Sequence, residues 1–285
     1  MAIETVGIFL KPGRPEAAAV VRSVVKFLSE KAVEGLCDPD AASLAGGVSL
    51  PRDEIVKRAD LAVVLGGDGT LLSVARAVGA RSVPILGVNL GTLGFLTEVS
   101  VEEVIDTLGL ALSGAISPEP RFRLEAVVTR DGTERGRFLA LNDAVIAKTA
   151  LSRMINLAAT ANGDPVTTLH ADGLIVSTPT GSTAYSLSAG GPLLLPGSGV
   201  VVLTPICPHA LTQRPFVFPQ SVVLEVEVDT RGGQVSLTVD GQDGMDLLDG
   251  DCVRLGPSEH PAWMIASPTR NHFEILREKL RWGER

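Results

Sequence analysis

The chain has 285 residues, of which 45% are hydrophobic and 20% are charged, and its formal net charge is −8. This length fits one large domain or two ordinary ones, and the composition is that of a globular protein with an apolar core. The acidic balance argues against a nucleic-acid partner, because such a partner requires a basic face. No stretch approaches the roughly 18 consecutive apolar residues of a membrane helix, so we expect no membrane partner.

The three cysteines, Cys37, Cys207 and Cys252, show no paired spacing. That pattern is typical of a reducing compartment and indicates neither a disulfide framework nor a metal cluster. The chain enters a strand-like run at residues 5–10 without a charged leader and a long apolar segment. We therefore expect a cytoplasmic protein.

Strand and helix patterns alternate over the first part of the chain, which predicts an α/β domain with a parallel sheet at residues 1–118. Strands are expected at residues 5–10, 61–65 and 83–88. Helices are expected along the apolar face from Val21 to Ala32, at about residues 70–79, and from a Ser-x-x-Glu capping box at Ser100 to about residue 113.

The pattern changes near Pro118, and from there to about residue 265 apolar and polar residues alternate with a period of two. Leu224, Val226 and Val228, for example, are separated by glutamates. This alternation predicts a second, mainly antiparallel β domain at residues 119–265. Turns between its strands are expected at Asp131-Gly132, Asn162-Gly163 and Asp240-Gly241.

The last segment, from Asn271 to Trp282, returns to a helical pattern with Phe273, Leu276 and Leu280 on one side. A single terminal helix cannot bury such a face by itself. We therefore expect residues 266–285 to pack back on the first domain.

Residues 61–70, Leu-Ala-Val-Val-Leu-Gly-Gly-Asp-Gly-Thr, place one acid among three glycines between a buried strand and a helix. Glycines let backbone N–H groups approach a ligand closely, and a helix N-terminus favours phosphate. Asp68 repels phosphate unless it handles a metal ion or a proton, so the turn favours phosphoryl transfer. An ordinary turn in which Asp68 only caps the helix explains the same residues. The turn has neither the spacing of a dinucleotide fingerprint nor the lysine of a Walker loop.

Residues 172–192 form a second unusual segment, in which a short buried strand at 174–176 runs into a loop dense in hydroxyl groups. One or two helical turns are expected from Ser182 to Ser188. Because each buried hydroxyl needs a partner, this density suits a loop that holds a sugar, a phosphate and an amide together. A solvated Ser/Thr loop is the alternative.

Asn142 and Asp143 interrupt an apolar strand pattern between these two segments. Adjacent strand side chains point to opposite faces, so both can contact one ligand only near a strand end or a bulge. A hairpin turn explains the same pair equally well.

Taken together, several segments resemble the signature motifs of NAD kinases (ATP-NAD kinases) of the bacterial type. They are Gly66-Gly67-Asp68-Gly69-Thr70, Asn89-Leu90-Gly91-Thr92-Leu93-Gly94-Phe95-Leu96, Asn142-Asp143 and residues 172–192, with a similar tail from Phe273 to Gly283. The resemblance covers most of the chain from about residue 60. It implies an enzyme that transfers the γ-phosphoryl group of ATP to the 2′-hydroxyl of the adenosine ribose in NAD, giving NADP, and a second domain that binds the dinucleotide.

The resemblance also implies roles for single residues. Asp68 is the expected catalytic residue, as general base or as the group that orients the acceptor hydroxyl. Gly67 and Gly69 are expected to present amides to phosphate, and Asn142 and Asp143 to hold the adenine and the ribose. The remaining expected dinucleotide-binding residues are Arg153, His170, Asp172, Thr183, Ala184, Tyr185, Ser186, Leu187, Ser188 and Gln242.

A ribose hydroxyl is a far weaker acid than a carboxylic acid. We therefore expect Asp68 to orient the hydroxyl and to take its proton as the new bond forms. A role of Asp68 as a ligand of Mg²⁺ stays open. The expected cofactor is a divalent metal cation, Mg²⁺ above all, with ATP as phosphoryl donor, and the sequence does not indicate the metal ligands.

Two positions depart from the family pattern. Asp143 stands where many relatives carry a longer glutamate, and we expect the role of the carboxylate to survive. His170 stands where several bacterial relatives carry arginine, near the nicotinamide side. Arginine is permanently cationic whereas histidine is mostly neutral at pH 7, so the choice between NAD and NADH stays open here. His170 as an ordinary strand residue is the alternative.

Two other functions compete with this interpretation. A lipid kinase of the diacylglycerol type shares the Gly-Gly-Asp-Gly-Thr turn, but it needs an apolar slot that the hydroxyl-rich loop does not favour. A dinucleotide sensor without catalysis is the other. The expected partners are NAD and ATP as substrates and further copies of the chain in a homodimer or homotetramer, because the mean hydropathy of +0.27 is high for a soluble monomer.

Overall fold

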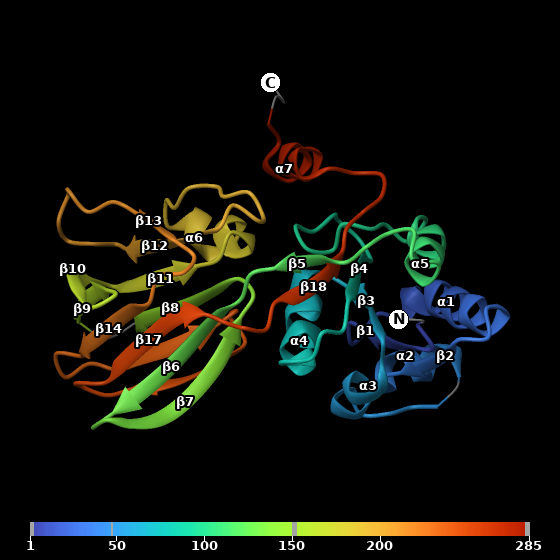
Figure 1. Cartoon of the computed structure of the whole chain (residues 1–285), viewed down its shortest axis with the longest axis horizontal. Coiled ribbons are helices and arrows are strands. Elements are labelled where there is room, and N and C mark those ends of the chain that lie inside the picture. The colour runs from blue at the N-terminus through green and yellow to red at the C-terminus, as the bar shows by residue number, and fades with distance from the viewer. Residues whose placement is uncertain (1–2, 47, 150–152, 283–285) are drawn as a thin grey trace. The chain divides into compact units, whose positions relative to one another are not determined.

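The computed structural model describes residues 3–46, 48–149 and 153–282. The chain divides into two compact units, which Figure 1 shows in cartoon form. The first comprises Met1–Pro120 together with Ala262–Arg285, and the second comprises Arg121–Pro261. No helix among the described residues is long and apolar enough to cross a membrane.

The first unit contains a six-stranded sheet with the strand order β2-β1-β3-β4-β18-β5. Strands β1 to β4 and β18 pair in parallel, which confirms the predicted α/β domain with a parallel sheet. Strand β3 is buried at every residue, as expected where helices cover both faces of a sheet. The strands are β1 (Thr5–Leu10), β2 (Glu34–Cys37), β3 (Leu61–Gly66), β4 (Ile85–Asn89), β5 (Glu119–Arg121) and β18 (Ala262–Ile265).

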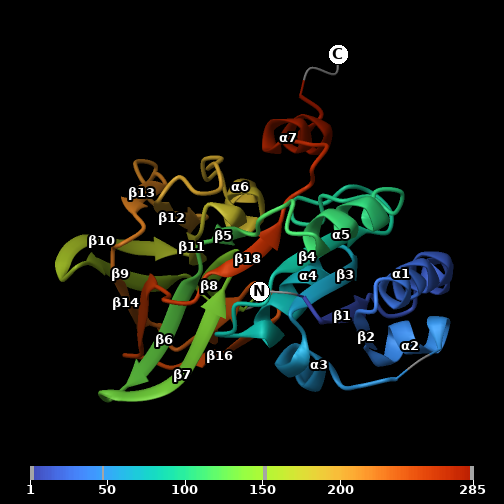
Figure 2. The same cartoon turned by 45° about the vertical axis from the view of Figure 1, so that its right-hand side comes forward.

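Helices α1 to α5 lie around this sheet, whereas α7 stands apart from it, as Figure 2 shows from a second direction. Helix α1 contacts α2 and α5, whereas α3 contacts α4. The apolar face of α1, which includes Val21 and Leu28, lies in the core as the sequence predicts. The helices are α1 (Ala18–Glu30), α2 (Pro39–Ala45), α3 (Arg52–Arg58), α4 (Asp68–Val78), α5 (Val104–Leu112) and α7 (His272–Leu280), with a 3₁₀ turn at Pro15–Ala17.

The helix expected from Ser100 begins four residues later, at Val104. The Ser100 N–H does donate to the Glu103 carboxylate, at 2.9 Å, as in a capping box. The same carboxylate also pairs with Arg270 at 2.6 Å and accepts from the Thr269 hydroxyl at 2.6 Å. Glu103 therefore serves a contact with the C-terminal segment, which the local sequence pattern does not reveal.

The C-terminal segment belongs to the first unit, and its helix is α7. The helix has a capping box between Asn271 and Glu274. Leu276 is buried as predicted, but Phe273 is 54% exposed, and Ile275 is buried in its place. Strand Ala262–Ile265, which the alternating pattern assigns to the second domain, pairs instead with β4 of the first. Four residues are too few for a period-two pattern to tell one sheet from another.

The second unit consists of two six-stranded sheets with the orders β10-β9-β14-β17-β6-β7 and β13-β12-β11-β8-β15-β16. Their pairs are antiparallel, as predicted. One core of buried aliphatic side chains includes residues of both sheets. The strands are β6 (Leu124–Arg130), β7 (Thr133–Ala140), β8 (Asp143–Lys148), β9 (Ile155–Ala161), β10 (Asp164–Ala171), β11 (Gly173–Ser177), β12 (Val200–Ile206), β13 (Phe216–Pro219), β14 (Leu224–Asp229), β15 (Val235–Val239), β16 (Asp243–Leu247) and β17 (Cys252–Pro257).

The three predicted turn dipeptides connect β6 to β7, β9 to β10 and β15 to β16. Both residues of each dipeptide have positive φ, for example 51° at Asp240 and 66° at Gly241. Such positive angles are typical of tight hairpin turns, which have two residues between the strands in the first two hairpins and three in the β15–β16 hairpin. The sequence therefore locates these three hairpins correctly.

Candidate active site

The glycine-rich turn joins the end of β3 to the start of α4. Gly66 ends the strand, and a Cβ atom there would come within 2.6 Å of the Thr70 hydroxyl. Gly67 is the N-cap of α4, and a Cβ atom there would meet nothing within 4 Å. The space in front of Gly67 is therefore open to a ligand, directly before the N-terminus of an eleven-residue helix.

The Asp68 carboxylate is bound by the loop that follows β4. Its Oδ1 accepts three hydrogen bonds, from the N–H groups of Leu96 and Thr97 at 3.0 Å and from the Thr97 hydroxyl at 3.1 Å. Its Oδ2 accepts one, from the Phe95 N–H at 2.9 Å. A carboxylate oxygen has two lone pairs, so Oδ2 retains one for another donor or a cation. All four donors lie in residues 95–97, which does not fit the interpretation of Asp68 as a helix cap.

Gly94 fits this arrangement because it has no side chain. A Cβ atom there would collide with Asp68 Oδ1 and with the Thr97 hydroxyl. The loop is also tied to the turn, because the Leu90 N–H donates to the Gly66 carbonyl at 3.2 Å. Gly94 stands within a quoted motif, yet sequence reasoning gave it no role, since the contact with Asp68 appears only in the fold.

Replacing Gly94 by alanine is expected to displace the Asp68 carboxylate and to lower kcat about tenfold or more, since a misplacement of about 1 Å can cost 10²-fold. The KM for NAD is expected to change less than about threefold. Steady-state kinetics check this. Gly91→Ala is the matched control, because a Cβ at Gly91 meets nothing within 4 Å. Equal effects of the two substitutions would contradict the prediction.

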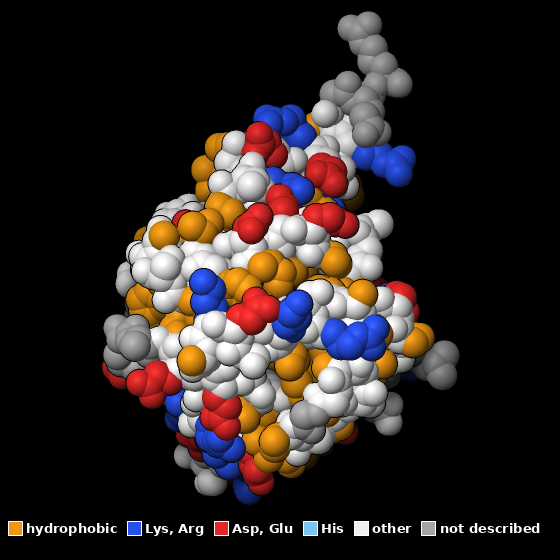
Figure 3. Space-filling model, turned by 90° about the vertical axis from the view of Figure 1, so that its right-hand side faces the viewer, with side chains coloured by type: hydrophobic (Ala, Val, Ile, Leu, Met, Phe, Trp, Pro, Cys, Tyr) orange, Lys and Arg blue, Asp and Glu red, His pale blue; other side chains and the backbone are white. Residues whose placement is uncertain are grey.

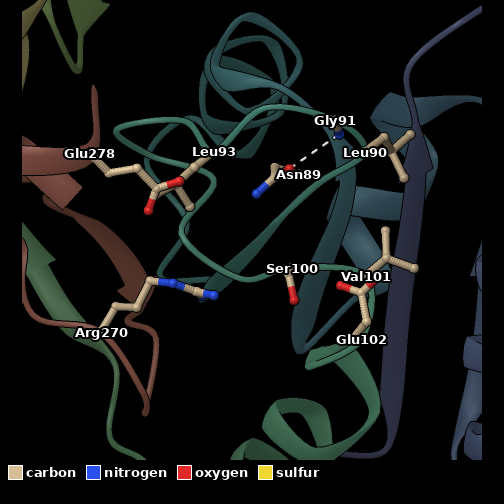
Figure 4. A pocket seen from close by; sticks show the side chains of 9 residues that line it. All are labelled: Asn89, Leu90, Gly91, Leu93, Ser100, Val101, Glu102, Arg270 and Glu278. Carbon is tan, nitrogen blue, oxygen red and sulfur yellow. Dashed lines mark hydrogen bonds between the residues drawn. The ribbon is translucent and has the colours of Figure 1, made fainter. Parts of the chain in front are cut away.

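A polar cavity of about 260 Å³ lies at the carboxyl end of β4 (Figure 4). The Asn89 side-chain oxygen accepts from the Gly91 N–H at 3.1 Å, and its amide nitrogen faces the cavity. The cavity occupies the edge of a parallel sheet at which α/β proteins bind ligands. Its lining residues are Asn89, Leu90, Gly91, Leu93, Ser100, Val101, Glu102, Arg270 and Glu278.

In the second unit, Asn142 and Asp143 lie where the chain crosses from one sheet to the other. Asp143 is the first residue of β8, so the pair stands at a strand end and is not a hairpin turn. The Asn142 carbonyl accepts from the Thr178 N–H at 2.9 Å. The side-chain oxygen of Asn142 is buried and has no hydrogen-bond partner among the described residues. A buried acceptor without a donor is a position where a ligand donor is expected.

The hydroxyl-rich segment packs directly on this pair. It forms a 3₁₀ turn at Thr180–Thr183 and a short helix, α6, at Tyr185–Ser188. A Cβ atom at Gly181 would collide with the backbone of Asn142. The Tyr185 N–H is a hydrogen-bond partner of the Asp143 carboxyl. The structure thus brings together these predicted residues, which lie some forty positions apart in the chain.

Most hydroxyls of this segment stabilise the segment itself. The Thr178 hydroxyl donates to the Leu141 carbonyl at 2.6 Å, and the Ser182 hydroxyl donates to the Pro179 carbonyl at 2.7 Å. Ser186 is completely buried against the Thr204 hydroxyl at 2.9 Å. Its side chain is thus directed away from solvent, and only its backbone is left for a ligand. The density of hydroxyls is therefore largely structural.

The other predicted residues of this segment differ in exposure. Tyr185 is 47% exposed, and Ser188 is exposed as well. Thr183, Ala184 and Leu187 are half-buried. Arg153 is exposed ahead of β9, and Gln242 is exposed in the β15–β16 turn.

His170 lies in β10, where its Nδ1 is 2.8 Å from the Asn156 side-chain oxygen. The Asn156 amide nitrogen donates to Asp229 at 2.8 Å, so its oxygen is the atom left to face the histidine. This arrangement places the proton of the neutral ring on Nδ1 and leaves Nε2 as an acceptor. Asp172, just beyond β10, is paired with Lys148 at 3.4 Å.

Burial and a neighbouring charge change the pKa of the Asp143 carboxyl. Burial, with repulsion from Asp240, raises the pKa of Asp143 from its ordinary value of 3.8 to about 7, against the hydrogen bond with Tyr185. Burial also raises the pKa of Asp240, but three backbone N–H donors and Arg123 oppose that rise. The charge of the pair therefore belongs on Asp240 and the proton on Asp143. Sequence reasoning missed this role of Asp240, because an Asp-Gly hairpin turn needs no further explanation.

Among the described residues, no group of three or more histidine, cysteine, aspartate or glutamate side chains is placed to hold a metal ion. The three cysteines are free, and Cys207 is the exposed one.

Two solved structures are similar to this chain over nearly its whole length. Yeast NADH kinase complexed with NADH has a TM-score of 0.90 and 29% identity, with coverage of 100% of this chain and 89% of that one. The NAD kinase from Archaeoglobus fulgidus in complex with ATP has a TM-score of 0.79 and 27% identity, with coverage of 96% and 99%. The fold is thus that of a kinase of nicotinamide dinucleotides.

Sequence comparisons agree. Residues 48–116 match the ATP-NAD kinase N-terminal domain, and residues 141–267 match the ATP-NAD kinase C-terminal domain. The NAD kinases of Syntrophotalea carbinolica and Geobacter sulfurreducens are 46% and 44% identical to the chain, over 99% of this chain and 100% of each relative. The chain belongs to the NAD kinase family. This confirms the predicted enzyme and does not support the lipid-kinase and sensor alternatives.

Proposed function

We propose that in this NAD kinase Asp68 acts on the acceptor hydroxyl while the Asn142–Asp143 pair holds the adenosine. The observation that carries the first role is the unequal pairing of the Asp68 carboxylate, whose Oδ1 accepts three hydrogen bonds and whose Oδ2 accepts one. Oδ2 is the atom left to accept the 2′-hydroxyl of the ribose. It orients that hydroxyl and takes its proton as the bond to phosphorus forms.

Phosphoryl transfer depends mainly on positioning and on neutralising charge. The backbone amides at Gly67 and Gly69 supply donors at the N-terminus of α4, where phosphate is favoured. Asp68 itself is held mostly by main-chain N–H groups, so it does not need to reorganise when the acceptor binds.

For the dinucleotide, the unpaired side-chain oxygen of Asn142 suits a donor such as the exocyclic amine of adenine. The Asp143 carboxyl, next to it, suits a ribose hydroxyl. The exposed ring of Tyr185 offers a flat apolar surface for a base. The role proposed for Asp172, on the nicotinamide side, and those for Thr183, Ala184, Leu187, Ser188, Arg153 and Gln242 rest on the family resemblance.

A divalent cation, Mg²⁺ above all, neutralises charge on the transferred phosphoryl group when it is bound. The residues present fit such an ion, because Mg²⁺ is usually held by one or two carboxylates together with substrate phosphates and water. From this chain, Asp68 Oδ2 is the oxygen that would hold the ion, as an alternative to accepting the hydroxyl, because one lone pair is left on that oxygen. ATP is the proposed donor, and the ATP complex of the Archaeoglobus fulgidus enzyme supports that choice.

One assay tests the reaction as a whole. The pure protein is incubated with ATP, Mg²⁺ and NAD, and NADP is measured with an NADP-specific dehydrogenase. NADP is expected, and no NADP is expected without Mg²⁺. A parallel reaction with NADH measures the preference to which we propose that His170 contributes. Absence of a phosphorylated dinucleotide from both reactions would overturn the proposal.

We also propose that the enzyme is a cytoplasmic homodimer or homotetramer. Supporting this, the first unit has an apolar groove of about 730 Å³ lined by Phe27, Ile105 and Leu110 among others. Figure 3 shows hydrophobic side chains among charged ones on the side of this unit that carries α1 and α2. Light scattering of the purified protein is expected to give a mass of two or four chains of 29.8 kDa.

A further inference from the structure

We propose that Asp240, with Arg123 as its counter-charge, is the positioning residue that holds the Asn142–Asp143 pair in its binding geometry. This inference rests on the dinucleotide-binding role proposed above for that pair. Asp240 lies in the β15–β16 turn, about a hundred residues further along the chain, and has a φ of 51°.

The Asp240 carboxylate accepts hydrogen bonds from three consecutive backbone N–H groups. Its Oδ2 accepts from Leu141 at 2.9 Å, and its Oδ1 accepts from Asn142 at 2.7 Å and from Asp143 at 3.1 Å. In return, the Asp240 N–H donates to the Asp143 carbonyl at 2.9 Å. Four hydrogen bonds thus fix a three-residue crossing between the two sheets.

A carboxylate is well suited to this position. Where a chain leaves one sheet for another, successive amides lose their ladder partners and still need acceptors. Only an ionised carboxylate offers two oxygens that both accept without a donor between them. An asparagine in its place turns one of the two sites into a donor that faces an N–H group.

Arg123 completes the arrangement. Its side chain is 2% exposed, and it is the largest fully buried side chain among the described residues. Burial lowers the pKa of its guanidinium, and the Asp240 charge opposes that change. A buried arginine needs an anion nearby, and Asp240 supplies it.

The held pair has the features of a binding element. Asn142 carries the unpaired side-chain oxygen. Its backbone packs against Gly181, and its carbonyl accepts a hydrogen bond from the Thr178 N–H. The groups acting on the Asp143 carboxyl are the Asp240 carboxylate from the turn and the Tyr185 N–H from α6. A substitution of Asp240 is therefore expected to displace the side chains of both Asn142 and Asp143, although Asp240 itself is not proposed to contact the dinucleotide.

The test is Asp240→Asn, with kcat and the KM for NAD measured separately between pH 5.5 and 9. The KM for NAD is expected to rise about tenfold or more, as when a buried donor loses its acceptor, with kcat within about threefold. Any inflection of the KM near pH 7 is expected to move to lower pH, because the repulsion on Asp143 is gone. Asp246→Asn, an exposed aspartate on the same hairpin, is the control and is expected to change neither parameter.

A second variant separates positioning from stability. Asp240→Asn removes a negative charge that acts on the buried Arg123, so the double variant with Arg123→Met, which removes the positive charge as well, is expected to recover thermal stability. A high KM for NAD in this stable double variant supports the proposal. Recovery of the KM together with stability, or failure of both variants to fold, would assign Asp240 to stability alone and overturn it.

Asn142→Ala distinguishes failure of this inference from failure of the proposed binding role. It is expected to raise the KM for NAD. If it does so while Asp240→Asn has no effect, only the positioning role fails. If Asn142→Ala leaves the KM unchanged, the binding role of the pair fails, and the positioning role fails with it.

Discussion

Asp68→Asn is expected to lower kcat by about 10²–10⁴-fold, the usual contribution of general-base assistance. The amide can keep its oxygen toward Leu96 and Thr97, but its nitrogen then replaces Oδ2, which accepts from Phe95 and retains the remaining lone pair. The variant therefore orients the hydroxyl poorly and cannot take its proton. Quenched-flow or steady-state measurement of NADP formation gives kcat.

Two measurements make this result specific. The dissociation constant for NAD is expected to stay within a few-fold of the wild-type value. Thr97→Val removes one hydroxyl donor to Oδ1 and keeps the carboxylate, so its kcat is expected to fall less than tenfold. A kcat near the wild-type value in Asp68→Asn would remove Asp68 from the mechanism.

Asp143→Asn is expected to make the protein more stable than the wild type above about pH 7, with little difference near pH 4. The folded protein keeps the Asp143 proton up to a pKa of about 7, whereas the unfolded chain loses it near the ordinary value of 3.8. Wild-type stability therefore falls as the pH rises through this interval and then levels off. At 1.36 kcal/mol per pKa unit the interval corresponds to at most about 4 kcal/mol.

Urea unfolding at several pH values between 4 and 9 measures this difference. Asparagine does not titrate, so the two curves of stability against pH are expected to separate as the pH rises. Asp164→Asn, at an exposed position at the start of β10, is the control and is expected to follow the wild type at every pH. Parallel curves for Asp143→Asn and the wild type would show that the buried carboxyl has an ordinary pKa.

Local patterns were sufficient for much of the fold. The buried valine-rich run before Gly66 predicts β3, and the Asp-Gly and Asn-Gly pairs predict three hairpins, because these signals depend on a few adjacent residues. The placement of Ala262–Ile265 could not be predicted in this way, since β18 is defined by its pairing with β4, which is far away in the chain. For the same reason the buried face of α7 was predicted wrongly at Phe273.

For the candidate site, the sequence indicates the segments but not how their atoms are used. Asp68 and the Asn142–Asp143 pair stand out because acids and amides are unusual in apolar strands and glycine turns. The partners that define their chemistry, Thr97 and Asp240, carry no local signal. A threonine in a loop and an aspartate in a hairpin turn are both common.

The way Asp68 is held has a consequence for how this enzyme can vary. Three of its four donors are main-chain amides, and a main-chain amide is present whatever side chain the residue carries. The ring of Phe95 is therefore free for another contact, with the Lys279 ammonium 5.6 Å from its centre. The side chain at position 95 can change, and with it the contact with α7, while the Asp68 carboxylate keeps its main-chain donors. In this short loop, the backbone that positions Asp68 and the side chain that faces α7 can therefore change independently of each other.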